Sequence, residues 1–226
     1  NAQGKDGRTP LMHASHDGYA DVAQLLIDNG ADVNFKNKYI ASPINFASFF
    51  GNADVAQLLI DNGADINDKT EDGRTPLMNA SHDGYEDVAQ LLIDNGADVD
   101  AQDKDGWTPL MRAVDNGYRS LTKLLLDNGA DPYAKNEDGW TAYDIAKEKG
   151  HTDVVKIIEE YQSKQPKFNQ EKTDELIELM NSVESFSDWK EYHSEKAIQL
   201  IKEGADINDK SDDAYTPLSY ASYYGY

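Results

Sequence analysis

The chain of 226 residues carries twice as many acidic as basic side chains, 42 Asp and Glu against 21 Lys and Arg, and its formal net charge is −21. Binding to nucleic acids or anionic membranes without sequence preference requires clusters of basic side chains, so we expect neither as a partner. The absence of cysteine excludes disulfides, thiol nucleophiles and Cys-ligated zinc. No segment approaches the roughly 20 consecutive apolar residues that span a bilayer.

The charge also indicates what kind of partner to expect. An acidic protein attracts a protein with a basic surface and repels acidic ones. The first eight residues are polar and lack the apolar run of a secretory signal. Together with the missing cysteine, this favours an intracellular location.

The sequence repeats itself with a period of 33 residues. A Ser-Pro or Thr-Pro pair, replaced by Thr-Ala in the last case, begins at residues 9, 42, 75, 108 and 141. Residues 6–34 and 72–100 align without a gap and differ only at His13/Asn79, Ala20/Glu86 and Asn34/Asp100. A period of this length indicates short units that bury their apolar sides by stacking on one another.

The unit that begins near residue 70 shows how one repeat is built. Residues 72–74, Asp-Gly-Arg, favour a turn. Thr75 suits a helix N-cap with Pro76 at the first helical position, and Gly84 ends this first helix. A second helix with a nearly continuous apolar face follows and ends at Gly96.

The motif Asp-Gly-x-Thr-Pro-Leu, followed by Gly, Leu-Leu and Gly-Ala-Asp-Val-Asn, resembles the ankyrin repeat over residues 1–161. The resemblance implies an all-α solenoid of stacked helix-turn-helix units with projecting β-turn fingers. The units start near residues 4, 37, 70, 103 and 136, and the polar last unit is similar to a C-terminal capping repeat. The second unit lacks the Asp-Gly of its finger in residues 37–41, so we expect that turn to have a different shape.

Residues 162–170 form a polar linker in this interpretation, and residues 171–226 form a second segment. Helices are expected at 173–183 and 196–203, like an N-terminal capping pair, with an enlarged loop at 184–194 between them. An incomplete ankyrin repeat then starts at Tyr215-Thr216-Pro217-Leu218. We expect residues 211–226 to present apolar surface and either to pack on the first repeat of another copy, which drives association, or to fold back on their own.

Neither the histidines nor the Asp-rich turns match a pattern with catalytic or metal-binding chemistry. The five histidines form no His-Glu-x-x-His pair. Residues 103–106, Asp-Lys-Asp-Gly, are similar to the middle of a calcium loop, but Ala101 and Arg112 occupy the first and twelfth ligand positions. We therefore expect no enzyme activity, no metal and no cofactor.

In ankyrin arrays the finger tips and first helices line a concave groove that binds the partner. Carried over to this sequence, the resemblance implies that the partner-binding residues are Tyr39, Phe49, Phe50, Arg74, His82, Trp107, Asp115 and Trp140. The five aromatic members fall where a repeat needs no apolar side chain for its own stacking, and exposed aromatic anchors dominate many interfaces. Alternatively, Phe49 and Phe50 pack against the altered second finger. Tyr19, Tyr85 and Tyr118 directly follow a glycine and are expected to be structural.

The sequence thus predicts a protein–protein interaction module without catalysis. Two alternatives remain open: an engineered or permuted ankyrin scaffold, which the near-identical repeats favour, and the regulatory ankyrin part of a larger enzyme or effector. The unusual second finger and the enlarged loop count against an idealised design.

Overall fold

The computed structural model describes residues 3–4, 7–37, 41–164, 172, 175–176, 178–179 and 191–202. The chain divides into two compact units, Asn1–Gln162 and Ser163–Tyr226. All regular structure among the described residues is helical, as the predicted all-α class requires. None of the helices in this part of the chain is both long and apolar enough to cross a membrane.

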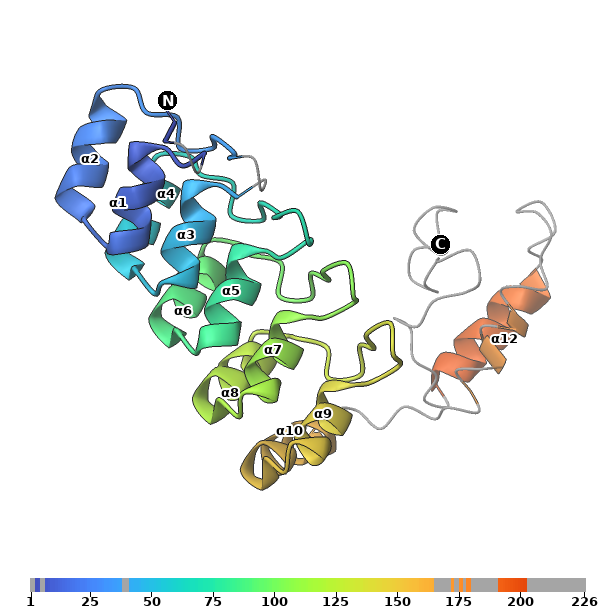
Figure 1. The fold of residues 1–226 in the computed structure, drawn as a ribbon. Coiled ribbons are helices and arrows are strands. Elements are labelled where there is room, and N and C mark those ends of the chain that lie inside the picture. Colours follow the sequence, from blue (N-terminus) through green and yellow to red (C-terminus); the bar gives the residue numbers. More distant parts are fainter. Residues whose placement is uncertain are drawn as a thin grey trace. The chain divides into compact units, whose positions relative to one another are not determined.

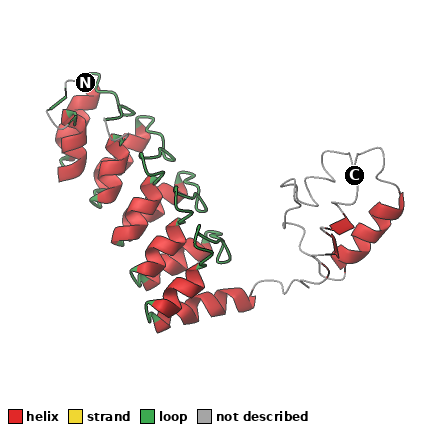
Figure 2. Ribbon diagram, turned by 45° about the vertical axis from the view of Figure 1, so that its right-hand side comes forward, coloured by secondary structure: helices red, strands yellow, loops and turns green. Residues whose placement is uncertain are grey.

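The first unit is an array of five helix pairs, followed in Figure 1 from blue to gold. The first helices of the pairs are α1 (Pro10–Asp17), α3 (Pro43–Phe49), α5 (Pro76–Asp83), α7 (Pro109–Asp115) and α9 (Ala142–Glu148). The second helices are α2 (Ala20–Asp28), α4 (Ala53–Asp61), α6 (Glu86–Asp94), α8 (Arg119–Asp127) and α10 (Thr152–Lys164). First helices pack on first helices, and α2, α4, α6 and α8 pack on one another in a second row. The long loops between pairs project to one side of the array (Figure 2).

Each first helix begins at the residue after a Ser or Thr, as the sequence predicts. In four repeats the threonine hydroxyl accepts a hydrogen bond of 3.3 Å from the backbone N–H three residues later. Ser42 makes no such cap, and its hydroxyl instead accepts a hydrogen bond from Asn45 Nδ2 at 3.1 Å. Asn45 stands where repeats 1, 3 and 4 have a buried methionine, so the second repeat begins its helix differently.

The core of the array is continuous from repeat to repeat. Leu77 and Leu92 of repeat 3 and Leu110 and Leu125 of repeat 4 are all at most 1% exposed and belong to one hydrophobic cluster. No single pair of short helices encloses this cluster, so each repeat depends on its neighbours for stability.

Each finger after the first is closed by two hydrogen bonds between its first and last residues. These residues are Asn37 and Ala41, Thr70 and Arg74, Asp103 and Trp107, and Asn136 and Trp140. The backbone N–H of the first donates to the carbonyl of the last at 3.0–3.1 Å. The side chain of the first then accepts the N–H of the last at 2.9–3.1 Å. The second finger therefore closes like the others, while its tip, residues 38–40, where a different shape was expected, lies outside the described residues.

The second unit contains α12 (Glu191–Lys202), and Leu176 and Leu200 form a small buried cluster. Two sequence-based boundaries differ from the structure. Residues 191–194 already belong to α12 and not to the enlarged loop, and α10 continues through residues 162–164, which were expected in the linker. The rest of that loop and the incomplete repeat at 211–226 lie outside the described residues.

Candidate functional site

The candidate binding surface consists of the fingers together with the first helices of the array. Neighbouring fingers are joined by their backbones: the Lys104 N–H donates to the Asp72 carbonyl at 3.1 Å, and the Glu137 N–H donates to the Asp105 carbonyl at 3.0 Å. Gly73 lies at this contact, and a Cβ there would come within 3.0 Å of the Lys104 nitrogen. The third, fourth and fifth fingers thus form one connected edge that holds its side chains at fixed spacing.

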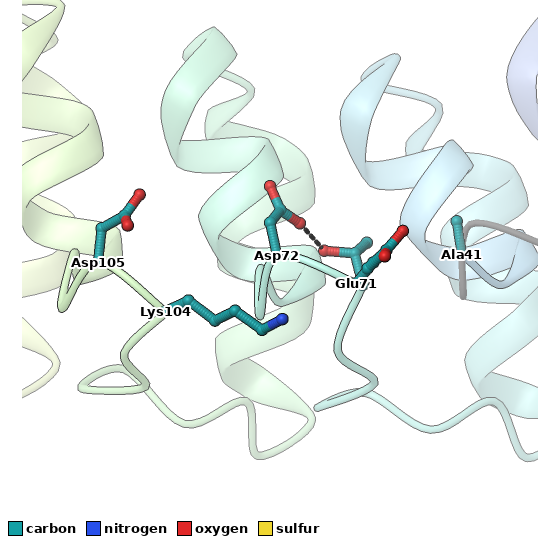
Figure 3. Close-up of a pocket in the computed structure, with 6 residues that line it drawn as sticks. Ala41, Glu71, Asp72, Lys104 and Asp105 are labelled. Atoms are coloured by element: carbon teal, nitrogen blue, oxygen red, sulfur yellow. Dashed lines mark hydrogen bonds between the residues drawn. The ribbon is translucent and has the colours of Figure 1, made fainter.

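An acidic hollow opens between the second, third and fourth fingers (Figure 3). Its volume is about 540 Å³, and it is lined by Ala41, Thr70, Glu71, Asp72, Lys104 and Asp105. Partial burial acts to raise the pKa of Asp72, but the Thr70 hydroxyl and the Arg74 charge outweigh burial and lower it below its ordinary value. With three carboxylates and one amine in its lining, the hollow carries negative charge at neutral pH.

A second, smaller hollow adjoins the acidic one and shares Ala41, Thr70 and Asp72 with it. Its volume is about 280 Å³, and its remaining lining residues are Arg8, Asn45, Phe46, Phe49, Phe50, Arg74 and Asn79. The size is just below the roughly 300–1,000 Å³ of typical small-molecule sites. A hollow of this volume suits one large side chain of a partner better than a drug-sized ligand.

The wall of this aromatic hollow is built from side chains that hold one another. The rings of Phe49 and Phe50 meet edge to face with their centroids 5.0 Å apart. The His16 ring lies with its centroid 3.8 Å from that of Phe50, and the Arg8 guanidinium lies 4.8 Å from the centre of Phe46. Phe49 and Phe50 nevertheless remain 40% and 37% exposed, so part of each ring is free to contact a partner. The alternative packing against the second finger involves residues 38–40, which are not described.

A buried polar network fixes this part of the surface. Asn45 Nδ2 donates to Asp68 Oδ2 at 3.0 Å, and Asn79 Nδ2 donates to Asn45 Oδ1 at 3.3 Å. Lys36 forms an ion pair with the same Asp68, which is only 3% exposed. In the two following repeats, Met and Ala take the places of Asn45 and Asp68. Burying these polar groups is costly unless they bond one another, so the network holds repeats 2 and 3 in one register.

Trp107 is held at the base of the fourth finger by Arg112, whose guanidinium carbon lies 4.5 Å from the ring centre. Arg112 in turn forms a buried ion pair with Asp103, the residue that closes the finger. Trp107 also packs against the hydrophobic core. The expectation that stacking does not require this side chain is therefore wrong, because part of the ring supports the array.

The other expected site residues are spread along the array. Trp140 is 39% exposed at the fifth finger. His82 Nδ1 lies 3.1 Å from the carboxylate of Asp83, and Asp115 pairs with Lys149 of the fifth repeat at 2.8 Å. Phe49, Phe50 and Arg74 come together around the aromatic hollow, and Tyr39 lies outside the described residues.

Seven residues that line the aromatic hollow were not among the expected site residues: Arg8, Ala41, Asn45, Phe46, Thr70, Asp72 and Asn79. A signal for Phe46 and Asn79 was present in the sequence. Phe46 and Asn79 occupy the same place in successive repeats, and that place holds His13 in repeat 1 and Arg112 in repeat 4. A position that varies while its neighbours repeat indicates a side chain that serves something other than stacking.

Among the described residues, no group of three or more His, Asp or Glu side chains is placed to hold a metal ion. His16 pairs with the adjacent Asp17 at 2.6 Å. The ring of His151 lies against Gly117, with Nε2 3.1 Å from the carbonyl oxygen of Asp115. These contacts link side chains within and between repeats.

The family of the chain follows from three overlapping matches. Residues 1–70, 44–136 and 98–172 each match the family model described as ankyrin repeats in three copies. The chain belongs to the ankyrin-repeat family. This confirms the predicted ankyrin solenoid, and ankyrin repeats are generally protein–protein interaction modules that are typically not catalytic. Among proteins with curated descriptions, none matches the chain.

Proposed function

We propose that this ankyrin array binds a protein segment in which a basic side chain lies close to an aromatic or other large apolar one. The observation that carries the proposal is the direct contact between the two hollows, which share Ala41, Thr70 and Asp72. The carboxylates of Glu71 and Asp105 suit a Lys or Arg of the partner. The exposed faces of the Phe pair suit its apolar neighbour, because burying a ring against them removes apolar surface from water.

The charge of the whole chain supports the same kind of partner. A net charge of −21 attracts a basic surface over a distance of about one Debye length, roughly 8 Å at physiological ionic strength. The contact surface then extends from the hollows along the fingers, with His82, Asp115, Trp107 and Trp140 as further contacts and Tyr39 at the second finger tip. The function is binding, with no catalytic step.

The test uses random 12-residue peptides displayed on phage and selected on the full chain. We expect the selected peptides to combine Lys or Arg with an aromatic or large aliphatic residue. Selected peptides are then synthesised, labelled and titrated against variants. The double change Glu71→Gln and Asp105→Asn, and separately Phe50→Ala, should each weaken binding at least about tenfold, which corresponds to about 1.4 kcal/mol.

The matched control removes a charge of the same sign elsewhere. Asp127 is exposed at the end of α8, a second helix, so Asp127→Asn should leave peptide binding unchanged. Selection of peptides without basic residues, or equal loss of affinity in Asp127→Asn and the hollow variants, would contradict the proposed site.

We also propose that the chain associates with itself through residues 211–226. The support is the sequence of this segment, in which Tyr215-Thr216-Pro217-Leu218 and Gly225 have the pattern of a first helix of the array. Sedimentation of the full chain over a range of concentrations tests this part of the proposal separately.

A further inference from the structure

Two buried amides line the aromatic hollow together with its exposed rings. Asn45 and Asn79 are 3% and 4% exposed, whereas Phe49 and Phe50, which line the same hollow, are 40% and 37% exposed. The amides therefore lie deeper in the hollow than the two rings. A side chain that enters past the rings brings its far end to the amides.

The ion pair of Lys36 with Asp68 decides which way each amide faces. A carboxylate only accepts hydrogen bonds, so Asn45 faces it with Nδ2, which donates to Asp68 Oδ2 at 3.0 Å and to Ser42 Oγ at 3.1 Å. These two bonds use both N–H groups of Asn45. Its Oδ1 is left to accept, and Asn79 Nδ2 donates to it at 3.3 Å. The orientation set by Asp68 is thus passed through Asn45 to Asn79.

Asn79 Oδ1 is the acceptor at the end of this chain of hydrogen bonds. No donor within the described part of the chain bonds this oxygen, and it is not sealed in the core. Its open side faces the hollow that Asn79 lines. An acceptor at this depth weakens binding when a ligand displaces its water and offers no donor in return.

The chemistry of the aromatic side chains narrows the ligand to tyrosine. Phenylalanine has no donor, tryptophan has a donor on the side of its ring system, and tyrosine has one at the tip that enters deepest. The tyrosine hydroxyl also accepts hydrogen bonds, which suits Arg74. That guanidinium lines the same hollow and has five N–H donors, more than its ion pair with Asp72 at 2.9 Å uses.

We propose that the aromatic hollow takes a tyrosine side chain of the bound segment, whose hydroxyl donates to Asn79 Oδ1. Asn79 is the residue that determines this specificity. Lys36, Asp68 and Asn45 are positioning residues that hold its oxygen towards the ligand. The inference rests on the proposed function and adds the identity of the large apolar residue.

The first test measures the preference for tyrosine on the unaltered chain. Peptides selected on the full chain should carry Tyr at the position whose replacement by alanine removes the effect of Phe50→Ala. One such peptide is compared with versions that carry phenylalanine or 4-fluorophenylalanine there; neither has a donor, and the second has nearly the size of tyrosine. Both should bind at least about tenfold more weakly, because Asn79 Oδ1 is left without a donor.

The second test removes the acceptor from the hollow. Asn79→Leu has nearly the same size, and the tyrosine peptide should lose most of its advantage. The phenylalanine peptide should bind this variant at least as tightly as the parent chain, which shows that the hollow is intact. Asn128→Leu is the matched control, since Asn128 is exposed directly after α8, and it should leave the preference unchanged.

The third test releases the orientation of the Asn79 amide. The double variant Asn45→Met and Asp68→Ala carries the residues that the next two repeats have at these places. Its probe is a peptide with 4-pyridylalanine, whose ring nitrogen accepts but does not donate at about pH 8. Its affinity relative to the phenylalanine peptide should rise about threefold or more, because the amide is then able to turn its N–H towards the ligand. A merely structural role of the network would lower both affinities alike.

The outcomes separate the inference from the proposed function. Equal affinity of the tyrosine and phenylalanine peptides for the parent chain, or selection of other residues at that position, overturns the tyrosine assignment and leaves the binding surface standing. An unchanged preference in Asn79→Leu overturns Asn79 as the acceptor, and an unchanged ratio in the double variant overturns the positioning residues. Peptides whose affinity does not respond to Phe50→Ala overturn the proposed site and the tyrosine assignment with it.

Discussion

The Asp103 carboxylate and the Arg112 guanidinium form a buried ion pair across the base of the fourth finger. The same carboxylate accepts the N–H groups of Asp105 and Trp107 at 3.0 and 2.9 Å. One side chain therefore closes the finger, neutralises the arginine and places the guanidinium over the Trp107 ring. The finger and the first helix are held as one piece.

Trp107 and Trp140 occupy the same position in successive fingers, yet replacing each with alanine should change the stability of the array by different amounts. Trp107→Ala should lower the free energy of unfolding by about 1–3 kcal/mol, less than for a fully buried ring because Trp107 is half-buried. Trp140→Ala, at a more exposed site, should cost less than about 0.5 kcal/mol. Urea denaturation of the two variants measures the difference. Equal losses of unfolding free energy in the two variants would show that the Trp107 ring does not stabilise the array.

Leu92→Ala should destabilise the array strongly. Leu92 is 0% exposed in the cluster shared by the repeats, and truncating such a side chain costs about 2–5 kcal/mol because it leaves a cavity. Leu25→Ala serves as the control, since Leu25 is 63% exposed, and should change stability by less than about 0.5 kcal/mol. Thermal melts at a concentration where the chain is monomeric decide the matter, and a small effect of Leu92→Ala would contradict the stacked core.

Asp100→Asn should stabilise the protein at neutral pH. Burial, aided by the charges of Asp131 and Asp98, raises the pKa of Asp100, although the Asp131 N–H bonds its carboxylate and acts the other way. The folded state therefore binds the Asp100 proton more tightly than the unfolded state, and ionisation weakens folding as the pH rises. Asn34 bonds the next repeat at the equivalent place without charge, through both its amide oxygen and its nitrogen.

The expected gain for Asp100→Asn is less than about 0.5 kcal/mol at pH 7, because the Asp100 side chain is exposed and solvent screens the neighbouring charges. Its pH-dependent part is complete above the raised pKa and disappears as the pH falls below the ordinary value of about 3.9. Denaturation midpoints between pH 3 and 8 measure this dependence, with Asp127→Asn at the end of α8 as the control. A stability gain of Asp100→Asn that grows as the pH falls would contradict the raised pKa of Asp100.

Association with a basic partner peptide should become slower as salt is added. The attraction arises from the net charge of −21, and the Debye length shortens from about 30 Å at 0.01 M to about 3 Å at 1 M ionic strength. Stopped-flow measurement of the on-rate across this range is the test. An on-rate that does not change with ionic strength would exclude electrostatic steering.

The helices and their stacking could be predicted because the repeat signal is local and occurs five times. Thr75 is followed by Pro76 and Gly84 at spacings that define a helix start and end without reference to the rest of the fold. The aromatic hollow was only partly predictable. Asn45 bonds Asp68 and Asn79, which are 23 and 34 residues away, and nothing near Asn45 in the sequence identifies those partners.

For Trp107 the sequence predicted the position at a finger but not the packing of the ring. Its place at a finger predicted an exposed ring. The ring is instead shared between the core and Arg112, and Arg112 stands at the variable position of the first helix, where other repeats have His13, Phe46 and Asn79. The residue at that variable position therefore affects how the side chain of the finger in the same repeat packs.

The backbone bonds from Lys104 to Asp72 and from Glu137 to Asp105 also limit how this array is able to change its specificity. A finger that carries a hydrogen-bonded neighbour on each side transmits any shift of its backbone to both. Exchanging the sequence of one finger for that of another would therefore alter recognition at the adjacent fingers as well. New specificities in such a protein arise more readily from single side-chain changes at the variable helix positions than from replacing whole fingers.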